Sequence, residues 1–288
     1  MTRIVAIISA IIITSCGLHA QPASEIYLFD LKIKKGNVSL ENGRNITNHK
    51  GYDNQPFFHP ELPLLYYSSA DSSGRTDIKA YNIGSKRTVK ITNTNEREYS
   101  PTITPDQQFI SCIIQRDNGA QDLGKYPASG GAASVVIDNL TVGYHVWQNN
   151  NTLFLFVLGE PMTLRKYSVV THRDSVIAEN IGRSLHKIPD QSAISFVQKT
   201  SSGDWLIKKI DEMGTMSILA STRPDKEDIA WTPDGRIMMS DGNKLFIMTP
   251  GTKDAWKEVS IKSYLALKGI SRISINPAGS TIALVVEE

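Results

Sequence analysis

The sequence predicts an all-β protein: a six-bladed β-propeller of four-stranded blades, closed by pairing N-terminal strands with C-terminal strands. Three observations predict this fold. A turn signal recurs at a nearly constant spacing, short apolar strands flank each turn, and each end of the chain supplies about half of one repeat. A period of about 40–45 residues that contains four short strands is typical of one propeller blade.

The recurring turn centres on a proline. Its five copies are His59-Pro60-Glu61, Thr104-Pro105-Asp106, Ile188-Pro189-Asp190, Thr232-Pro233-Asp234 and Asn276-Pro277-Ala278. The gaps between the prolines are 45, 84, 44 and 44 residues, and 84 is two periods of 42. The absent copy should lie near residues 147–150, where a polar turn without proline stands between two apolar runs. Six turns therefore predict six blades.

Each turn is flanked by two short strands. Residues 229–232 precede Pro233, for example, and residues 236–239 follow it. Proline suits the turn because it presets φ, and it would interrupt a hydrogen-bonded ladder elsewhere. A polar loop that contains glycine then leads to two more strands, as at residues 77–81 and 88–91. This order gives four strands per period.

The two ends of the chain complement each other. Residues 272–276 and 281–286 supply only two strands, whereas residues 25–31 and 39–47 have the pattern of the third and fourth strands of a blade. Pairing the two halves completes one blade and removes exposed sheet edges, which a β-protein must otherwise protect. We therefore expect residues 24–288 to form a single domain.

The repeats resemble those of TolB-like, WD40-like propellers of the bacterial envelope. Trp231-Thr232-Pro233-Asp234-Gly235 matches the aromatic residue and turn of that repeat, and Ser24-Glu25-Ile26-Tyr27 and Thr76-Asp77-Ile78 match its later element. The likeness covers residues 24–288, and residues 123–205 depart from it most. It implies the fold, and it implies a role as an interaction platform. A shared fold alone does not carry a function.

The first 20 residues have the pattern of an export signal. Arg3 precedes an apolar run at residues 4–13, which is too short for a membrane span of about 20 residues. Two processing sites are open: cleavage after Ala20, or lipid attachment at Cys16, which ends a lipobox-like Ile-Thr-Ser-Cys. Both predict an exported protein, located in the periplasm or at the outer membrane.

Composition agrees with an ordinary globular domain. The chain has 31 Lys and Arg against 29 Asp and Glu, and 40% of its 288 residues are hydrophobic. These values exclude a disordered, collagen-like or polytopic membrane protein. The formal net charge of +2 gives no support to nucleic-acid binding, which needs a basic face. We expect a monomer, and we expect it to touch the membrane only if Cys16 is kept and lipidated, through that anchor.

In a propeller, the loops that lead into the innermost strands converge around the central channel. Here these loops offer carboxylates, aromatic rings, an imidazole and a guanidinium, a mixture that suits a polar ligand or a peptide. The ligand-binding candidates are Asp53, Glu98, Tyr99, Tyr144, His145, Asp228 and Arg272. The alternative is that these side chains pair with one another or remain solvated.

The sequence carries no signature of catalysis or of a cofactor. It has no Gly-x-Ser-x-Gly, P-loop or Gly-x-Gly-x-x-Gly motif. The histidines after residue 20 lack zinc-ligand spacing, and the oxygen-rich loop at residues 71–77 lacks EF-hand spacing. We therefore expect no catalytic residue, no metal and no other cofactor.

The sequence favours a non-catalytic binding or scaffolding propeller that engages a protein partner in the bacterial envelope. One alternative is a glycan-active lyase or hydrolase, in which His145 or Tyr144 is the acid or base, oriented by Asp53, Glu98 or Asp228. A second alternative is a small-ligand sensor that uses the same channel mouth.

Overall fold

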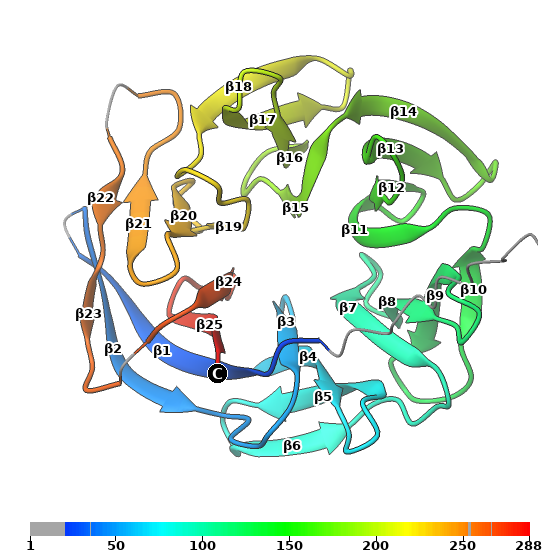
Figure 1. Ribbon diagram of the computed structural model, residues 1–288, viewed down its shortest axis with the longest axis horizontal. Coiled ribbons are helices and arrows are strands. Elements are labelled where there is room, and N and C mark those ends of the chain that lie inside the picture. The colour runs from blue at the N-terminus through cyan, green and yellow to red at the C-terminus, as the bar shows by residue number, and fades with distance from the viewer. Residues whose placement is uncertain (1–20, 35, 253–254, 266) are drawn as a thin grey trace, which may run out of the picture.

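The computed structural model describes residues 21–34, 36–252, 255–265 and 267–288. Within these residues, six β-sheets stand in a ring around a central channel (Figure 1). Each sheet runs from an innermost strand at the channel to outer strands at the rim. The predicted six-bladed propeller is confirmed. The expected export signal and Cys16 lie outside the described residues, so they stay predictions.

Blades 1 to 5 each add their strands in chain order from the channel outwards. Blade 1 contains β3 (Asp53–Phe58), β4 (Leu64–Ala70), β5 (Thr76–Asn82) and β6 (Arg87–Lys90). Blade 2 contains β7 (Arg97–Ile103), β8 (Phe109–Gln115), β9 (Gln121–Pro127) and β10 (Ser134–Ile137). Blade 3 contains β11 (Val142–Asn149), β12 (Thr152–Val157), β13 (Thr163–Ser168) and β14 (Arg173–Glu179).

Blade 4 contains β15 (Ile181–Lys187), β16 (Ala193–Lys199), β17 (Trp205–Asp211) and β18 (Met216–Ser221). Blade 5 contains β19 (Ile229–Trp231), β20 (Ile237–Ser240), β21 (Leu245–Met248) and β22 (Lys257–Glu258). The hairpin between β11 and β12 occupies the slot where the repeat lacks its proline. The interpretation of that slot as a sixth turn is therefore correct.

Blade 6 joins the two ends of the chain, as the half-repeats predict. It contains β24 (Ile270–Ile275), β25 (Thr281–Glu287), β1 (Ser24–Lys34) and β2 (Asn37–Asn45). Strand β1 lies between β25 and β2, with Ser24 opposite Glu287 and Asp30 opposite Thr281. The N-terminal strand β1 is thus the third strand from the channel in the closing blade, and its backbone is paired on both sides.

Blade 6 also has a fifth strand, which the repeat pattern does not predict. After the two residues of β22, the chain crosses from blade 5 to blade 6 and forms β23 (Ser260–Lys262). Strand β23 pairs in parallel with β2, with Ser39 opposite Ser260. The segment is short and polar, so it lacks the apolar alternation by which a strand is recognised in a sequence.

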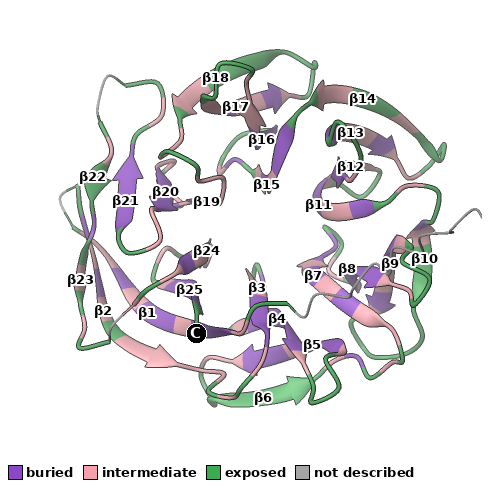
Figure 2. Ribbon diagram, viewed as in Figure 1, coloured by how far each residue is buried: buried purple, intermediate pink, exposed green. Residues whose placement is uncertain are grey.

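The apolar core lies between neighbouring blades and is concentrated on the inner strands (Figure 2). Phe29 and Leu40 of blade 6, for example, are fully buried in one cluster with Ala230 and Met238 of blade 5. Full burial of one such large apolar side chain stabilises the fold by about 2 kcal/mol. Each blade therefore depends on both of its neighbours, which makes the closed ring the stable form.

Two equivalent hydrogen bonds fasten neighbouring blades at the same level of the repeat. Trp147 of β11 donates its Nε1–H to the Ser111 hydroxyl of blade 2 at 2.8 Å. Trp231 of β19 donates to the Ser195 hydroxyl of blade 4, also at 2.8 Å. A buried indole N–H needs such a partner. These two tryptophans therefore join neighbouring blades, Trp147 as a buried and Trp231 as a partly buried side chain.

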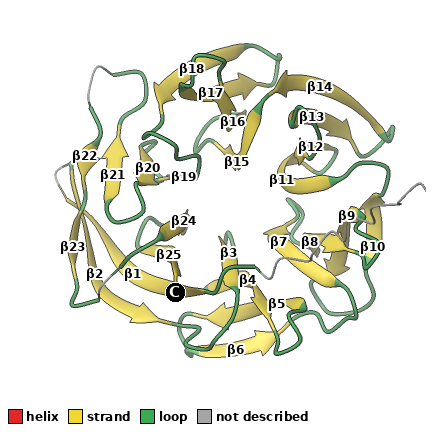
Figure 3. Cartoon of the chain, viewed as in Figure 1, coloured by secondary structure: helices red, strands yellow, loops and turns green. Residues whose placement is uncertain are grey.

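The described residues form strands and loops (Figure 3). They include no helix with the length and apolar character that a membrane crossing requires.

Candidate functional site

The central channel contains two cavities that meet at a narrow waist. The cavity at one mouth has a volume of about 280 Å³, and the cavity on the other side of the waist has about 110 Å³. Four residues line both cavities and so form the waist: Gln55, Tyr144, Arg183 and Arg272. The larger mouth is also lined by Tyr52, Asn54 and Tyr99, so tyrosine rings surround the approach to two guanidinium groups.

The waist side chains form one hydrogen-bonded network around the channel. Arg272 Nη2 donates to the Tyr144 hydroxyl at 2.5 Å, and its guanidinium lies 5.0 Å from the centre of that ring. Arg272 Nη1 lies 3.4 Å from one carboxylate oxygen of Asp228, and Arg183 Nη2 lies 2.7 Å from the other. Asp228 therefore holds two cations that come from two different blades.

The network continues to the remaining blades through Gln55. Gln55 Nε2 donates to the Tyr144 hydroxyl at 3.4 Å, and Gln55 Oε1 accepts the backbone N–H of Ser100 at 2.7 Å. Gln55 belongs to blade 1, Ser100 to blade 2, Tyr144 to blade 3, Arg183 to blade 4, Asp228 to the start of blade 5 and Arg272 to blade 6. We call these six residues the waist ring, because it contains one residue from every blade.

The backbone is strained where the waist ring begins. Gln55 and Ser100 have φ values of 58° and 53°, a region that side-chain-bearing residues rarely adopt. Each lies at a break in strand register, between Asn54 and Phe57 in β3 and between Tyr99 and Thr102 in β7. Such bulges re-aim a side chain, and strained positions concentrate at functional sites.

The waist ring carries a surplus of positive charge. Its own ionised groups are two guanidiniums and one carboxylate, and the side chains of Arg272 and Asp228 are only 14% and 18% exposed. Outside the ring, Glu227 lies 3.5 Å from Arg183 Nε and 3.4 Å from Lys199, so this carboxylate is shared between two cations. Burial opposes the charge on Arg183, but Asp228 outweighs it and raises the pKa of Arg183 above its usual value. Burial likewise opposes the charge on Arg272, while Tyr144 and Asp228 raise its pKa. Both arginines are therefore charged, and an anion would neutralise the surplus.

Several buried polar atoms around the channel have no hydrogen-bond partner. Three such atoms belong to residues that line the two cavities: Ser100 Oγ, His145 Nδ1 and Ser271 Oγ. A fourth, Arg183 Nε, lies 3.5 Å from the Glu227 carboxylate in an ion pair. Buried polar atoms in folded proteins nearly always have partners, in the protein, in water or in a ligand. The walls of the channel therefore hold unused hydrogen-bonding capacity on both sides of the waist.

Five of the seven residues predicted from the sequence lie at the channel. Tyr99, Tyr144 and Arg272 line the mouth cavity, and His145 and Asp228 line the smaller one. His145 is buried, its Nε2 lies 2.8 Å from the Ser111 hydroxyl, and burial lowers its pKa to about 3. It is therefore neutral, and its place is between blades 2 and 3. That these five residues bind a ligand stays a prediction.

The structure places Asp53 and Glu98 away from both cavities. The Asp53 carboxylate is fully buried 2.9 Å from His49 Nε2, and burial raises its pKa. Glu98 accepts hydrogen bonds from Thr94 and Tyr126, and burial raises its pKa as well. Both residues lie within strands, where successive side chains point to opposite faces. A residue next to a channel-facing position therefore faces the neighbouring strands or blade instead.

Gln55, Ser100 and Arg183 are absent from the sequence-based candidates, although the repeat marks two of these positions. Five residues before each proline of the turn repeat stand Gln55, Ser100, Ser184, Asp228 and Arg272. Tyr144 precedes Asn149, in the slot without proline, by the same interval. Blade 4 departs by one residue, because the register of β15 shifts between Ile181 and Leu185 and Arg183 takes the place at the waist.

No described group of three or more His, Cys, Asp or Glu side chains is arranged to hold a metal ion. The described channel residues also contain no pair of facing carboxylates, which glycoside hydrolysis commonly uses. What the waist offers is a phenol in contact with a guanidinium, two charged arginines and unpartnered donors. This arrangement can bind and orient an anionic or strongly polar group.

Comparisons with known proteins identify the fold. No protein-family model matches the sequence, and no curated protein is similar to it. A structure of a protein assigned as TolB from Agrobacterium tumefaciens is 13% identical, with a TM-score of 0.69 over 93% of this chain and 99% of that one. The fold is thus that of a TolB-like six-bladed propeller.

Two further solved structures share this fold. A chain of the nidogen–laminin complex is 8% identical, with a TM-score of 0.64 over 91% of this chain and 98% of that one. An oligogalacturonate lyase in complex with manganese is 14% identical, with a TM-score of 0.60 over 88% of this chain and 83% of that one.

Proposed function

We propose that this protein is an exported, non-catalytic propeller that binds a protein partner in the bacterial envelope through the mouth of its channel. The observation that carries the proposal is the waist ring, a charged network open to a mouth cavity of about 280 Å³. The pattern of residues 1–20 supports export to the periplasm or outer membrane, with Cys16 either lipidated or removed.

The chemistry of the mouth supports a protein partner. Tyrosine and arginine are the residues that most often dominate binding energy at protein interfaces, and they work best in desolvated pockets. Tyr52, Tyr99 and Tyr144 surround the guanidiniums of Arg183 and Arg272 in this cavity. The cavity is small, so it suits one inserted side chain or chain end as an anchor, while the surrounding face supplies the remaining contact area.

The charge of the waist ring indicates which kind of chemical group the partner would insert. Asp228 is shared by Arg183 and Arg272, and Glu227 is shared by Arg183 and Lys199, so three cations face two carboxylates and the site attracts an acidic side chain or a C-terminal carboxylate. Arginine binds carboxylates with paired hydrogen bonds, and such charge-assisted bonds are about twice as strong as neutral ones. The nidogen–laminin complex supplies a precedent, since a propeller of the same fold occurs in an assembly of two proteins.

Cross-linking of the tagged full-length chain in native envelopes, followed by mass spectrometry, tests this proposal. We expect one stoichiometric protein partner with the wild type and loss of that partner with Arg272→Gln. Arg165→Gln is the matched control, because Arg165 is also bonded to an aspartate, Asp174 at 2.7 Å, but lies on blade 3 away from the channel. Urea unfolding of the purified variants shows whether each one is folded.

An empty pull-down from folded wild-type protein would overturn the proposal and favour a small-molecule ligand. Saturable heat release on titration with that ligand, without product formation, would then identify a sensor. A partner that Arg272→Gln still captures would leave an envelope-binding protein but remove the channel mouth from its interface.

A glycan-active enzyme is the second candidate, because Tyr144 Oη contacts Arg272 Nη2 at 2.5 Å. In a lyase, the Tyr144 phenolate would remove the proton next to a uronate carboxylate, and Arg272 would neutralise that carboxylate. The glycosidic oxygen would leave with a proton from solvent, and a carbon–carbon double bond would form in the product. Ultraviolet absorbance of the unsaturated product from polygalacturonate measures this reaction. Turnover that Tyr144→Phe abolishes would establish the enzyme.

A further inference from the structure

The cavity of about 110 Å³ on the far side of the waist has no part in the proposed function. We call it the inner cavity. Like the mouth cavity, it is lined by Arg183 and Arg272, but its lining also includes Ser100 and His186, which the mouth cavity lacks. These four residues come from blades 2, 4 and 6, which alternate around the ring (Figure 1). Polar groups therefore approach the inner cavity from three sides.

Ser100 brings an unused hydroxyl to the inner cavity. The residue is 9% exposed, and its Oγ is buried without a hydrogen-bond partner. Its backbone has a φ of 53° and is held through the N–H, which donates to Gln55 Oε1 at 2.7 Å. A buried hydroxyl without a partner lowers stability, and strained positions concentrate at functional sites. A ligand that bonds this hydroxyl would remove that cost.

His186 supplies a second donor. Ser184 Oγ accepts the backbone N–H of Ile229 at 3.1 Å, so its own proton is left for His186 Nε2 at 2.9 Å. Burial keeps the ring neutral by lowering its pKa to about 4. A neutral imidazole with an accepting Nε2 carries its proton on Nδ1. No described residue accepts a hydrogen bond from His186 Nδ1–H, so this donor is available to a ligand.

The two arginines give the inner cavity its charge. The one carboxylate in its described lining is that of Asp228, which Arg183 and Arg272 share. The two histidines in the lining are neutral, because burial lowers their pKa values: His145 and His186. The lining therefore carries one more positive than negative charge.

Charge and size together limit the ligand to a small monoanion. Outside the lining, Glu227 is shared by Arg183 and Lys199, so it leaves the surplus of one charge unchanged. The volume of about 110 Å³ corresponds to about four water molecules, since each occupies about 30 Å³ in the liquid. A carboxylate carries one negative charge at neutral pH and pairs well with arginine, whereas a phosphate group carries about 1.5 to 2. A small carboxylate therefore matches the cavity best.

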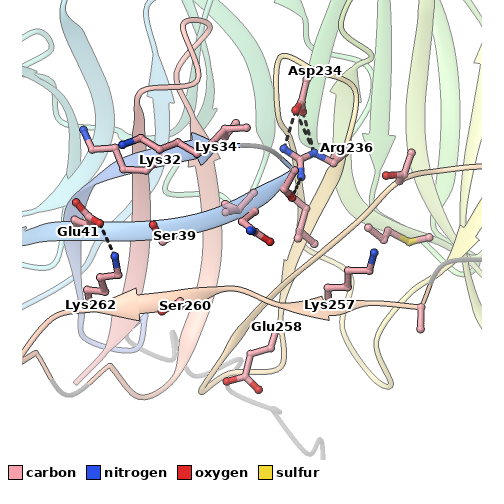
Figure 4. Close-up of a pocket in the computed structure, with 18 residues that line it drawn as sticks. Lys32, Lys34, Ser39, Glu41, Asp234, Arg236, Lys257, Glu258, Ser260 and Lys262 are labelled. Atoms are coloured by element: carbon pink, nitrogen blue, oxygen red, sulfur yellow. Dashed lines mark hydrogen bonds and ion pairs between the residues drawn. The ribbon is translucent and has the colours of Figure 1, made fainter.

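A larger cavity on the outer rim, between blades 5 and 6, lacks this unused capacity (Figure 4). Its volume is about 830 Å³, and two of its carboxylates are already paired, Glu41 with Lys262 at 3.0 Å and Asp234 with Arg236 at 2.7 Å. Among the described residues that line it, none has a buried side-chain polar atom without a partner. Unpartnered buried atoms, rather than volume, therefore distinguish the inner cavity.

We propose that the inner cavity binds the carboxylate of a small organic acid. The carboxylate oxygens would accept hydrogen bonds from Ser100 Oγ–H and His186 Nδ1–H, and the anion would neutralise the surplus charge of the two arginines. This inference goes beyond the proposed function, since it assigns a second, small ligand on the far side of the waist from the protein partner.

Urea unfolding of the purified protein at rising concentrations of acetate tests the inference. Acetamide is the matched probe, because it has the same shape without the charge. A ligand that binds only the folded state raises the free energy of unfolding as its site fills. We expect this rise with acetate, and we expect none with acetamide or with chloride at the same ionic strength.

Ser100→Ala should weaken acetate binding about tenfold, because it removes a hydrogen bond to a charged group. Without acetate, this variant should be at least as stable as the wild type, since the hydroxyl has no partner to lose. Ser271→Ala is the matched control: Ser271 Oγ is also buried without a partner, but the residue lines the mouth cavity and not the inner one. If Ser100→Ala fails to fold, Ser100→Gly removes the same hydroxyl and adopts a φ of 53° without strain.

Several outcomes would overturn the inner-cavity proposal. These are no rise with acetate, an equal rise with acetamide or chloride, or equal losses of acetate binding in Ser100→Ala and Ser271→Ala. A larger rise with phosphate than with acetate would overturn the assignment of a carboxylate. Loss of acetate binding in Ser271→Ala alone would place the acid at the mouth. Capture of the protein partner is measured separately by cross-linking, so each of these results would leave the proposed function intact.

Discussion

The waist ring and the seam between blades 5 and 6, where β23 pairs with β2, both gather charged side chains where blades meet, yet they are built in different ways. At the waist, the six residues interlock across the channel, and Asp228 is shared by two guanidiniums. At the seam, Glu41 and Glu258 each have their own exposed lysine partner, and Lys262 is 64% exposed. The comparison teaches that buried charges join the framework of the ring, whereas exposed charges are available to a partner at little cost to the fold.

Removing Asp228 should have the largest effect on stability. Asp228→Ala would leave Arg183 and Arg272 close together without their shared carboxylate. Loss of one member of a buried charge network costs about 3 kcal/mol, and partial exposure of these side chains reduces this to about 2 kcal/mol. Urea unfolding followed by tryptophan fluorescence measures the change. An unaltered free energy of unfolding would mean that the waist ring does not hold the blades together.

Acid should have the next largest effect, because it destabilises the fold through two buried histidines at the channel, His145 and His186. Burial lowers the pKa of His145 to about 3 and that of His186 to about 4. In the unfolded chain both histidines titrate near pH 6.5, so the unfolded state binds more protons below that pH. The stability that comes from these neutral histidines is complete above pH 6.5. It is lost as the pH falls toward 4, by up to about 1.4 kcal/mol per pH unit for each.

The measurement is the free energy of unfolding between pH 7 and pH 5 in the wild type and in His145→Gln. The slope against pH should be smaller in the variant by the share of one histidine. His59, whose pKa burial also lowers, is present in both proteins and cancels. Parallel slopes would show that His145 is accessible to protons in the folded state.

Substitutions of Gln55, where the backbone is strained, should reduce stability by a smaller amount. The difference between the alanine and glycine variants tests the strain. Gln55→Ala removes the hydrogen bonds from Ser68 and Ser100 and should cost about 2 kcal/mol. Gln55→Gly removes the same bonds, but glycine adopts a φ of 58° without strain. It should therefore recover about 1 kcal/mol of that loss. Thermal unfolding of the two variants side by side tests the order, which would reverse if the backbone at this position relaxed.

Breaking the ion pair between Lys262 and Glu41 at the seam should have the smallest effect on stability. Lys262→Ala removes the partner of Glu41, but both side chains are open to solvent. An exposed ion pair contributes little to stability, because water screens it and both side chains lose freedom when they pair. We expect the midpoint of urea unfolding to stay within experimental error at low and high salt. A clear loss of stability would instead mean that β23 clamps blade 6 to blade 5.

The sequence was sufficient for the architecture and only partly sufficient for the site. The sequence repeat has a nearly constant length, which is seen in the spacing of Pro60, Pro105, Pro189, Pro233 and Pro277. The number of blades and the closure of the ring can therefore be predicted from the number of repeats and the two half-repeats at the ends. The face to which a side chain points depends on its place in the strand. Asp53 and Glu98 come before the bulges of β3 and β7, so ordinary alternation points them away from the channel, whereas their neighbours Asn54 and Tyr99 line it.

The pairing of β23 with β2 at the seam could not be predicted from the sequence, for a different reason. Strand β23 has three residues, and its parallel pairing with β2 joins positions more than 200 residues apart. No local pattern encodes such a contact. Likewise, the approach of Arg183 to Asp228 depends on how two blades pack together, which a single repeat does not contain.

The position of β1 has a consequence for how the protein is made. Synthesis begins at the N-terminus, yet β1 finds its second neighbour only in β25, the last strand of the chain. Until residues 281–287 are available, one side of β1 stays an unpaired edge that can associate with other chains. The ring therefore cannot be completed blade by blade as the chain emerges. Loss of residues 281–287 would leave the whole circle open, whereas a deletion of equal length in a rim loop would not.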